Sequence, residues 1–258
     1  DDPRLAAEKF LHDITAATAS FSVTPKLQNL FPSDDAMRGT VDNSKGTIVR
    51  CDNTSLEAIE GQHATIKFAG HTHKTELKLK GIYNVQNAVG AVALVRMIMG
   101  DELDTKRMLA SLANVTPAFG RGETVMVDGL QCELVLVKNP SGFRLSLKSF
   151  DPSGYATMIA INDNYADGRD MSWLWDVDFD SLRAGGVAMI TGVRAYDMAL
   201  RMQYEEVEVS TVEPDIKQAL EQFISGGSDK PKRIYCTYTA MLALRRELAK
   251  RTNVETVR

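Results

Sequence analysis

Cysteine is scarce in this sequence, and positive charge is not in excess. The 258 residues include only three cysteines, Cys51, Cys132 and Cys236. Their odd number and wide spacing exclude a disulfide framework and a metal-ligand motif, and favour a reducing, cytoplasmic environment. The formal net charge is −4, so the composition gives no sign of a general nucleic-acid binder.

Long apolar runs are also missing. No run approaches the roughly 20 residues needed to cross a bilayer, and no secretory signal peptide opens the chain, so we expect no transmembrane segment. Hydrophobic residues make up 44% of the sequence and charged residues 25%, which is ordinary for a globular protein. The length suits one large domain or two small ones.

A phosphate-binding loop of the form G-x-x-x-x-G-K-[ST] does not occur. The first residue is Asp1 rather than Met, and the D-D-P-R opening is unusual for the start of a folded protein. We therefore expect the chain to be part of a longer protein. Any site that precedes Asp1 would lie outside this sequence.

The first half of the chain mixes helical and strand-like patterns. Apolar spacing predicts a helix over residues 4–18, another over 84–99 with Gly100 at its C-cap, and a third over 105–113. Short alternating runs predict strands over 47–50, 64–68 and 75–80. Residues 114–123, with one proline and two glycines, predict a hinge between domains.

Strands and helices alternate after this hinge, which predicts an open α/β sheet of mostly parallel strands. Expected strands cover 133–137, 155–161, 187–190, 207–209 and 233–236, and expected helical segments cover 141–150, 179–182, 195–204, 215–224 and 239–251. Ligands of such sheets bind where the strands end. Polar pairs follow four of these strands, at residues 138–139, 162–163, 191–192 and 237–238.

One of these strand ends is unusually acidic. We call residues 161–178 the acidic segment; it contains both tryptophans, Trp173 and Trp175, and five aspartates: Asp163, Asp167, Asp170, Asp176 and Asp178. A segment rich in Asn, Asp and Gly is also typical of a plain turn. The presence of two tryptophans and Arg169 favours a functional site.

Two further patterns are less specific. Asn84 and Asn87 are spaced by three at the start of the helix over 84–99, and a lone Asn there is typical of an N-cap. His71 and His73 would share one face of a strand, but no acidic or cysteine ligand follows at a fitting spacing, so we predict no metal site.

Several segments resemble Mur ligases. Residues 81–88, GIYNVQNA, resemble the G-x-x-N-x-x-N-A segment that lines the adenine pocket of the central domain, and Asp1-Asp2-Pro3 resembles its N-x-D-D-P segment. Residues 119–123, FGRGE, resemble the segment that opens the C-terminal domain. Residues 136–142 (LVKNPSG), 163–176 (DNYADGRDMSWLWD), 191–199 (TGVRAYDMA) and 238–242 (YTAML, with Arg245 beyond) resemble the MurT family.

The resemblance implies a fold and an activity. Residues 1–115 would be a remnant of the central ATPase domain without its phosphate-binding loop, and residues 116–258 a Rossmann-like C-terminal domain that docks a glutaminase. MurT proteins, with the glutaminase GatD, use ATP and Mg²⁺ to convert D-glutamate of the lipid II stem peptide to D-isoglutamine, at the inner face of the bacterial membrane. Without the loop, this chain alone is expected to be inactive. Many MurT proteins carry a four-cysteine zinc ribbon; only Cys51 lies in that region, so no zinc is predicted.

Roles for single residues also follow from the resemblance. Asp170, with Asp167 as second choice, would orient the catalytic histidine of the glutaminase. The alternative for Asp170 is to cap a turn that begins at Met171. Arg169, Trp173 and Trp175 would lie at the partner interface, although an ion-pair role for Arg169 and a packing role for the tryptophans remain open.

Nucleotide or substrate contacts are expected from five residues: Asn84, Asn87, Arg121, Lys138 and Asn139. Lys138 replaces an acidic residue common in other Mur ligases, and a solvated lysine is the alternative. Two other functions stay open for the whole chain. One is a non-catalytic docking module that only activates the glutaminase, and the other is an ordinary Mur ligase that adds an amino acid, which the MurT-like segments disfavour.

Overall fold

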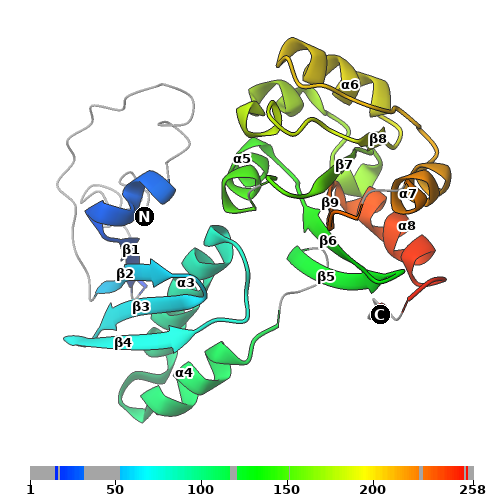
Figure 1. Cartoon of the computed structure of the whole chain (residues 1–258). Helices are drawn as coiled ribbons and strands as arrows, with labels where there is room; N and C mark the ends of the chain where they lie inside the picture. Colours follow the sequence, from blue (N-terminus) through cyan, green and yellow to red (C-terminus); the bar gives the residue numbers. More distant parts are fainter. Residues whose placement is uncertain are drawn as a thin grey trace. The chain divides into compact units, whose positions relative to one another are not determined.

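The computed structural model describes residues 15–16, 18–31, 53–116, 121–150, 152–226, 229–252 and 254. The chain divides into two compact units, residues 1–116 and 117–258 (Figure 1). The predicted strand over 47–50, Cys51 and the first fourteen residues lie outside the described part. Residues 15, 16 and 18, at the end of the helix predicted over 4–18, are not helical.

The first unit is a four-stranded sheet with helices. Its elements are β1 (Ser20–Val23), η1 (Pro25–Leu30), β2 (Asn53–Glu60), β3 (His63–Phe68), β4 (His71–Glu76), α3 (Ile82–Met99), η2 (Gly100–Glu102) and α4 (Thr105–Ala113). The strand order is β1-β2-β3-β4, parallel between β1 and β2 and antiparallel elsewhere. The predicted helices over 84–99 and 105–113 are confirmed.

Helix α3 packs against this sheet through an apolar face. Val85, Val89 and Val92 are buried in one cluster with Leu56 and Ile66 of the strands. Gly100 is the C-cap, as predicted, and its φ of 51° is a conformation that glycine adopts without strain. The N-cap is Gly81, so the N-cap role of Asn84 is wrong: Asn84 lies inside the helix and donates a hydrogen bond to the carbonyl of Lys80 (2.6 Å).

Strand β4 lies earlier in the sequence than expected. Phe68 pairs with His71, and Ala69 and Gly70 form the two-residue turn between β3 and β4, both at positive φ. Such a turn fixes the register of a hairpin, so the strand begins directly after Gly70. The predicted strand over 75–80 is therefore wrong beyond Glu76, and Leu77 is a buried core residue of the loop that follows.

Within the described residues, one segment, Ile82–Glu102, is long and apolar enough to cross a membrane by length and composition alone. No run of this kind was expected from the sequence. One face of α3 is buried on the sheet, and Arg96 near its end donates a hydrogen bond to the Thr54 hydroxyl (2.9 Å). These contacts are those of a helix in the core of a globular unit.

The second unit is built on a five-stranded sheet. Its elements are β5 (Arg121–Val127), β6 (Leu130–Leu136), α5 (Pro140–Ser149), β7 (Ala156–Ala160), η3 (Tyr165–Asp167), η4 (Ser172–Asp176), η5 (Asp180–Leu182), β8 (Met189–Thr191), α6 (Ala195–Tyr204), α7 (Ile216–Ser225), β9 (Lys232–Cys236) and α8 (Tyr238–Leu248). The strand order is β5-β6-β9-β7-β8. Only the β5–β6 pair is antiparallel, which confirms the mostly parallel α/β sheet.

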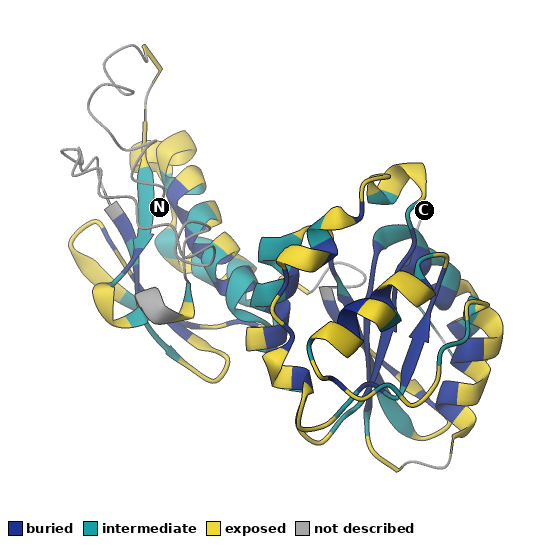
Figure 2. Cartoon of the chain, turned by 90° about the horizontal axis from the view of Figure 1, so that it is seen from above, coloured by how far each residue is buried: buried dark blue, intermediate teal, exposed yellow. Residues whose placement is uncertain are grey.

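Helices cover both faces of this sheet (Figure 1). Leu134, Met158 and Ile234 point into a cluster with residues of α7 and α8. Their neighbours alternate to the other face, where Tyr235 meets Phe143 of α5 with ring centroids 5.5 Å apart. Figure 2 shows the strands of this unit as buried and the outer faces of its helices as exposed.

Two expectations for this unit are corrected. Residues 121–123, predicted as part of the hinge, begin strand β5. The pairing register of β5 shifts between Arg121 and Glu123, and Gly122 lies in this bulge at positive φ. The strand predicted over 207–209 is wrong. Val209 forms an isolated parallel bridge with Val187, just before β8, and Val212 forms another with Ile190 of β8, so no continuous ladder forms.

A glycine turn at the end of β8 sets the shape of this sheet edge. Gly192 has a φ of 98°, and a Cβ placed there would lie 2.4 Å from the carbonyl oxygen of Ile161.

Gly192→Ala therefore should lower the free energy of unfolding by about 2 kcal/mol or more, measured by urea denaturation. Gly185→Ala, at a glycine with open space, is the matched control and should cost less than about 0.5 kcal/mol. Equal effects would contradict the steric argument.

Candidate functional site

Polar side chains that follow β7, β8 and β9 meet at one edge of the sheet, as the sequence predicted. The backbone N–H of Asn162 donates to the Thr237 hydroxyl (2.9 Å), which joins the ends of β7 and β9. The Asn162 side chain accepts from the backbone N–H of Val193 (3.0 Å), which adds the turn after β8. Asn162 and Thr237 are buried, so these bonds hold the edge together internally.

The hydroxyl of Thr239, in the first turn of α8, connects this edge to the acidic segment. It accepts hydrogen bonds from the side-chain amides of Asn162 (3.1 Å) and Asn164 (2.8 Å). It donates to Asp167 Oδ2 (2.5 Å). One hydroxyl thus uses its donor and both acceptor positions to hold three residues of the loop.

Asp167, the second choice for the orienting carboxylate, is occupied by this network. Its Oδ1 accepts from the backbone N–H of Thr239 (2.8 Å), and its Oδ2 also accepts from the N–H of Asn164 (3.1 Å), in a capping box around η3. A carboxylate at the free N–H groups of α8 is favoured by the helix dipole. The geometry gives Asp167 a structural role.

Asp170 is placed differently. It is exposed, and its Oδ1 accepts from the backbone N–H of Ser172 (2.9 Å) at the start of η4. This hydrogen bond holds the turn at Met171, as the capping alternative expected, although the N-cap residue of η4 is Met171 rather than Asp170. The side chain and backbone of Ser172 donate to the carboxylate and lower its pKa from the ordinary value. Asp170 is thus ionised at neutral pH, fixed in direction, and open to an outside donor.

Arg201 of α6 holds the end of the acidic segment. Its buried guanidinium donates to the carbonyls of Leu174 (3.3 Å) and Val177 (2.7 Å) and pairs with Glu205. It also lies 5.3 Å from the centre of the Trp175 ring. Because these bonds fix the backbone on both sides of Trp175, the indole is held in place although it is 49% exposed.

The two tryptophans differ in their surroundings. Trp173 is half-buried and meets the edge of the core residue Phe143, with centroids 6.4 Å apart, so its packing role is the one observed. Trp175 contacts the exposed Tyr204 instead (5.3 Å). Arg169 is exposed and forms no ion pair within the described parts of the chain. Of the predicted interface residues, Arg169 and Trp175 are the accessible ones.

The five predicted nucleotide or substrate contacts lie in both units. Asn87 and Lys138 are exposed, and the Lys138 ammonium lies 5.4 Å from the Tyr238 ring centre. Asn139 is the N-cap of α5 and accepts from the Gly142 N–H (2.7 Å), while Asn84 is buried and bonded to Lys80. Arg121 opens β5, and its side chain lies outside the described residues. Asn87 and Lys138 are thus exposed without a hydrogen bond shown for their side chains among the described residues, whereas Asn84 is buried and the exposed Asn139 already caps a helix.

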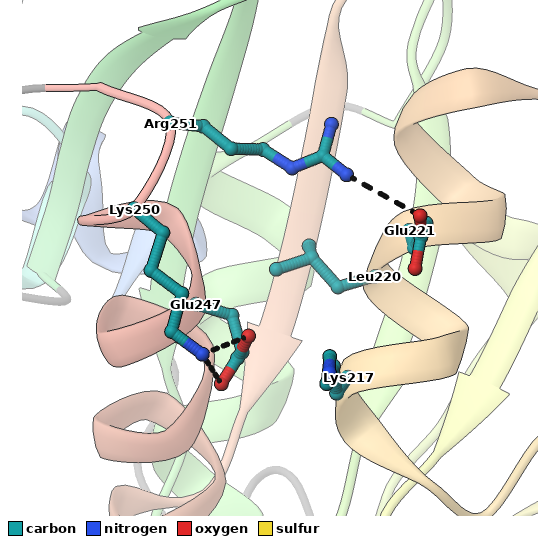
Figure 3. Close-up of a pocket in the computed structure, with 6 residues that line it drawn as sticks. All are labelled: Lys217, Leu220, Glu221, Glu247, Lys250 and Arg251. Carbon is teal, nitrogen blue, oxygen red and sulfur yellow. Dashed lines mark hydrogen bonds and ion pairs between the residues drawn. The ribbon is translucent and has the colours of Figure 1, made fainter.

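Other clusters of the second unit carry paired charges. Asp178, Asp180 and Glu205 lie close enough to share a cation, but Arg183 already pairs with Asp180 (2.5 Å) and Glu205 (3.1 Å). A groove of about 320 Å³ lies between α7 and α8 (Figure 3). There Lys250 binds both oxygens of Glu247 (2.7 Å), and Arg251 approaches Glu221 (3.9 Å), so neither cation is free for a ligand.

The remaining metal and cysteine candidates are structural. His73 stacks on Phe68 with centroids 4.2 Å apart, and the metal-ligand groupings found among the described residues do not include His71 or His73. Cys132 and Cys236 are buried free thiols, as expected of small apolar residues. Burial raises the pKa of Cys132 to about 12, so it is not a thiolate nucleophile at neutral pH.

Sequence reasoning missed Thr239 and Arg201. Thr239 begins a predicted helix, and Arg201 lies within one, but the residues of the acidic segment that they contact are 24 to 77 residues away along the chain. For Arg201, the sequence signal that could have indicated its role was a charged residue on the buried face of a helix.

Comparison with known proteins identifies the second unit. Residues 136–241 match the MurT ligase C-terminal family. These residues form a MurT ligase C-terminal domain. The match contains the acidic segment, Arg201 and Thr239, and it confirms the resemblance seen in the sequence.

Two curated relatives extend this result. The chain is 34% identical over 181 residues to the "Lipid II isoglutaminyl synthase (glutamine-hydrolyzing) subunit MurT" of Streptococcus pneumoniae, which covers 68% of this chain and 40% of the relative. It is 33% identical over 151 residues to the protein of that name from Staphylococcus aureus strain COL, covering 57% and 34%. The matched part of the chain thus spans less than half the length of these MurT relatives.

Solved structures show the same fold. A pseudomurein peptide ligase type C from Methanothermus fervidus aligns with a TM-score of 0.61 at 12% identity, over 81% of this chain and 44% of that one. MurF from Acinetobacter baumannii aligns with a TM-score of 0.59 at 16% identity, over 92% and 54%. The chain therefore has a Mur ligase-like α/β fold.

The different surroundings of Asp167 and Asp170 predict different effects on stability. Asp167→Ala removes three hydrogen bonds and should lower the free energy of unfolding by about 1–2 kcal/mol. Asp170→Ala, at an exposed carboxylate bonded only to its neighbour, should leave it close to the wild-type value. Urea denaturation of both variants measures the difference. A larger loss for Asp170→Ala would contradict the structural role given to Asp167.

Proposed function

We propose that the chain is part of a glutamine-dependent, ATP-driven amide ligase that converts D-glutamate of the lipid II stem peptide to D-isoglutamine. The names of the two curated relatives support this activity, and their designation as subunits implies a second subunit. We take that partner to be a glutaminase of the GatD type. The complex would act in the bacterial cytoplasm, at the inner face of the membrane where lipid II is exposed.

The proposed chemistry divides between the two subunits. The substrate carboxylate accepts a phosphoryl group to form an acyl phosphate, and ammonia then forms the C–N bond as phosphate leaves. Ammonia attacks only in its neutral form, so its release from glutamine inside a closed complex is an advantage. ATP with Mg²⁺ would supply the phosphoryl group. Asn87 and Lys138, both exposed polar residues, are the side chains we assign to nucleotide or substrate binding.

The exposed carboxylate of Asp170 carries the proposal. A glutaminase with a Cys–His pair needs a third group that fixes the tautomer of the histidine and stabilises the imidazolium. Asp170 is ionised and directed by Ser172, whereas Asp167 is used by Thr239 and Asn164. We therefore assign the orienting role to Asp170, which places it in the active site of the partner.

Glutamine hydrolysis tests this role. The full chain is mixed with a GatD-type glutaminase, and ammonia release is measured for wild type and for Asp170→Asn. The variant should lose roughly 100-fold or more of the activity, because an amide neither fixes the tautomer nor stabilises the imidazolium. Asp176→Asn, at an exposed aspartate of the same segment, is the matched control and should hydrolyse glutamine like wild type.

If Asp170→Asn keeps full activity, Asp170 is not the orienting carboxylate. A second candidate function is a docking module that only binds and activates the glutaminase. It is favoured by Trp175 and Arg169, which are accessible in the same segment as Asp170. The two functions separate when ATP and lipid II are added to the complex: glutamine hydrolysis without formation of the amide supports the docking module alone.

A further inference from the structure

The hydroxyl of Thr239 has one proton and two acceptor positions, and all of them are used. Both acceptor positions receive N–H groups, from the side-chain amides of Asn162 (3.1 Å) and Asn164 (2.8 Å). The single proton is therefore left for Asp167, whose Oδ2 lies 2.5 Å away. Asn162 is buried and bonded in turn to the ends of the strands. The direction in which Thr239 holds the Asp167 carboxylate is thus fixed by the sheet edge.

A short link joins this contact to the exposed carboxylate of the acidic segment. Asp170 is the third residue after Asp167, and three residues of extended chain span at most about 11 Å. On the other side of Asp170, the side chain of Met171 is buried. Asp170 therefore lies between two anchors, the bond from Thr239 to Asp167 before it and the buried Met171 after it. A shift of Asp167 is passed on to Asp170, because no long loop lies between them to absorb it.

The position of an orienting carboxylate decides its effect. The carboxylate must lie about 2.6–3.2 Å from the imidazole nitrogen, and a misplacement of about 1 Å in a catalytic site can lower a rate roughly 100-fold. The hydrogen bond from Ser172 directs the Asp170 carboxylate locally, but it comes from the same loop and moves with it. The position of the loop itself must come from contacts with other elements, and Thr239 of α8 supplies one.

We propose that Thr239 is a positioning residue for glutamine hydrolysis by the partner subunit: its hydroxyl holds Asp167, and Asp167 in turn sets where Asp170 meets the catalytic histidine. This inference rests on the proposed function. It adds that the geometry needed for activation is built into the second unit by a contact between the acidic segment and the first turn of α8. Thr239 acts through Asp167 and does not touch the reacting groups.

Glutamine hydrolysis by a GatD-type glutaminase, saturated with the full chain, tests this role. Saturation keeps the affinity between the subunits out of the measured rate. Thr239→Val keeps the branched shape and loses the hydroxyl. Its kcat should fall roughly 10-fold or more while KM for glutamine stays within about twofold, because the glutamine pocket belongs to the partner. The backbone N–H of Thr239 still reaches Asp167, so the loss should be smaller than that of Asp170→Asn.

Four further variants separate positioning from general destabilisation. Thr239→Ser keeps the hydroxyl and should bring kcat to within about threefold of wild type. Thr157→Val makes the same substitution as Thr239→Val at a buried threonine near the beginning of β7, and should keep the wild-type kcat. The double variant Thr239→Val/Asp170→Asn should lose no more than Asp170→Asn alone, because Thr239 acts through Asp170. Asp167→Ala breaks the same contact from its other side and should lower kcat at least as much as Thr239→Val. It keeps the test valid if Thr239→Val fails to fold.

The outcomes distinguish this inference from the proposed function. If Thr239→Val and Asp167→Ala keep the wild-type kcat while Asp170→Asn loses it, Thr239 is not a positioning residue and the proposed function stands. The inference is also overturned if Thr239→Ser is as slow as Thr239→Val, or if the losses multiply in the double variant. If Asp170→Asn keeps full activity, the role proposed for Asp170 fails and this inference fails with it.

Discussion

The hydroxyl of Thr239 is the interaction on which the candidate site depends. It joins the first turn of α8 to Asn162, Asn164 and Asp167, and so ties a loop after β7 to the end of β9. Without this hydroxyl, Asn162, Asn164 and Asp167 would lose the contact that joins all three to α8. With it, the loop leaves the sheet edge in one direction, and the residues beyond Asp167 are positioned from that point.

Arg201 is the second fixed point, at the other end of the segment. Between the two anchors the chain passes through Asp170 and the start of η4, where Ser172 holds the carboxylate. A catalytic group works only if its surroundings hold it close to the productive geometry. Asp167 is held by hydrogen bonds with Thr239 and Asn164, and Trp173 packs on Phe143, whereas Asp170 and Trp175 are exposed. This division between structural and accessible residues follows from the contacts rather than from the types of residue.

Much of the second unit could be predicted from the sequence, because its helices and buried strands have clear periodicity and its polar strand ends converge by topology. The assignment between Asp167 and Asp170 could not, since both are aspartates in one loop and the contact that ties Asp167 to α8 comes from Thr239, 72 residues away. The first unit was less predictable. The turn at Ala69-Gly70 shifted β4, and Gly81 rather than Asn84 begins α3, because local backbone conformation outweighed side-chain pattern at both places.

The central claim is that Asp170 completes the active site of another protein. A crystal structure of the full chain with its glutaminase tests this most directly, through the distance from the Asp170 carboxylate to the catalytic imidazole. We predict a hydrogen bond of about 3 Å to the imidazole nitrogen that faces away from the nucleophile, with Asp167 still bonded to Thr239. A complex in which Asp170 faces solvent, or in which Asp167 has left Thr239 to bind the histidine, would contradict the claim.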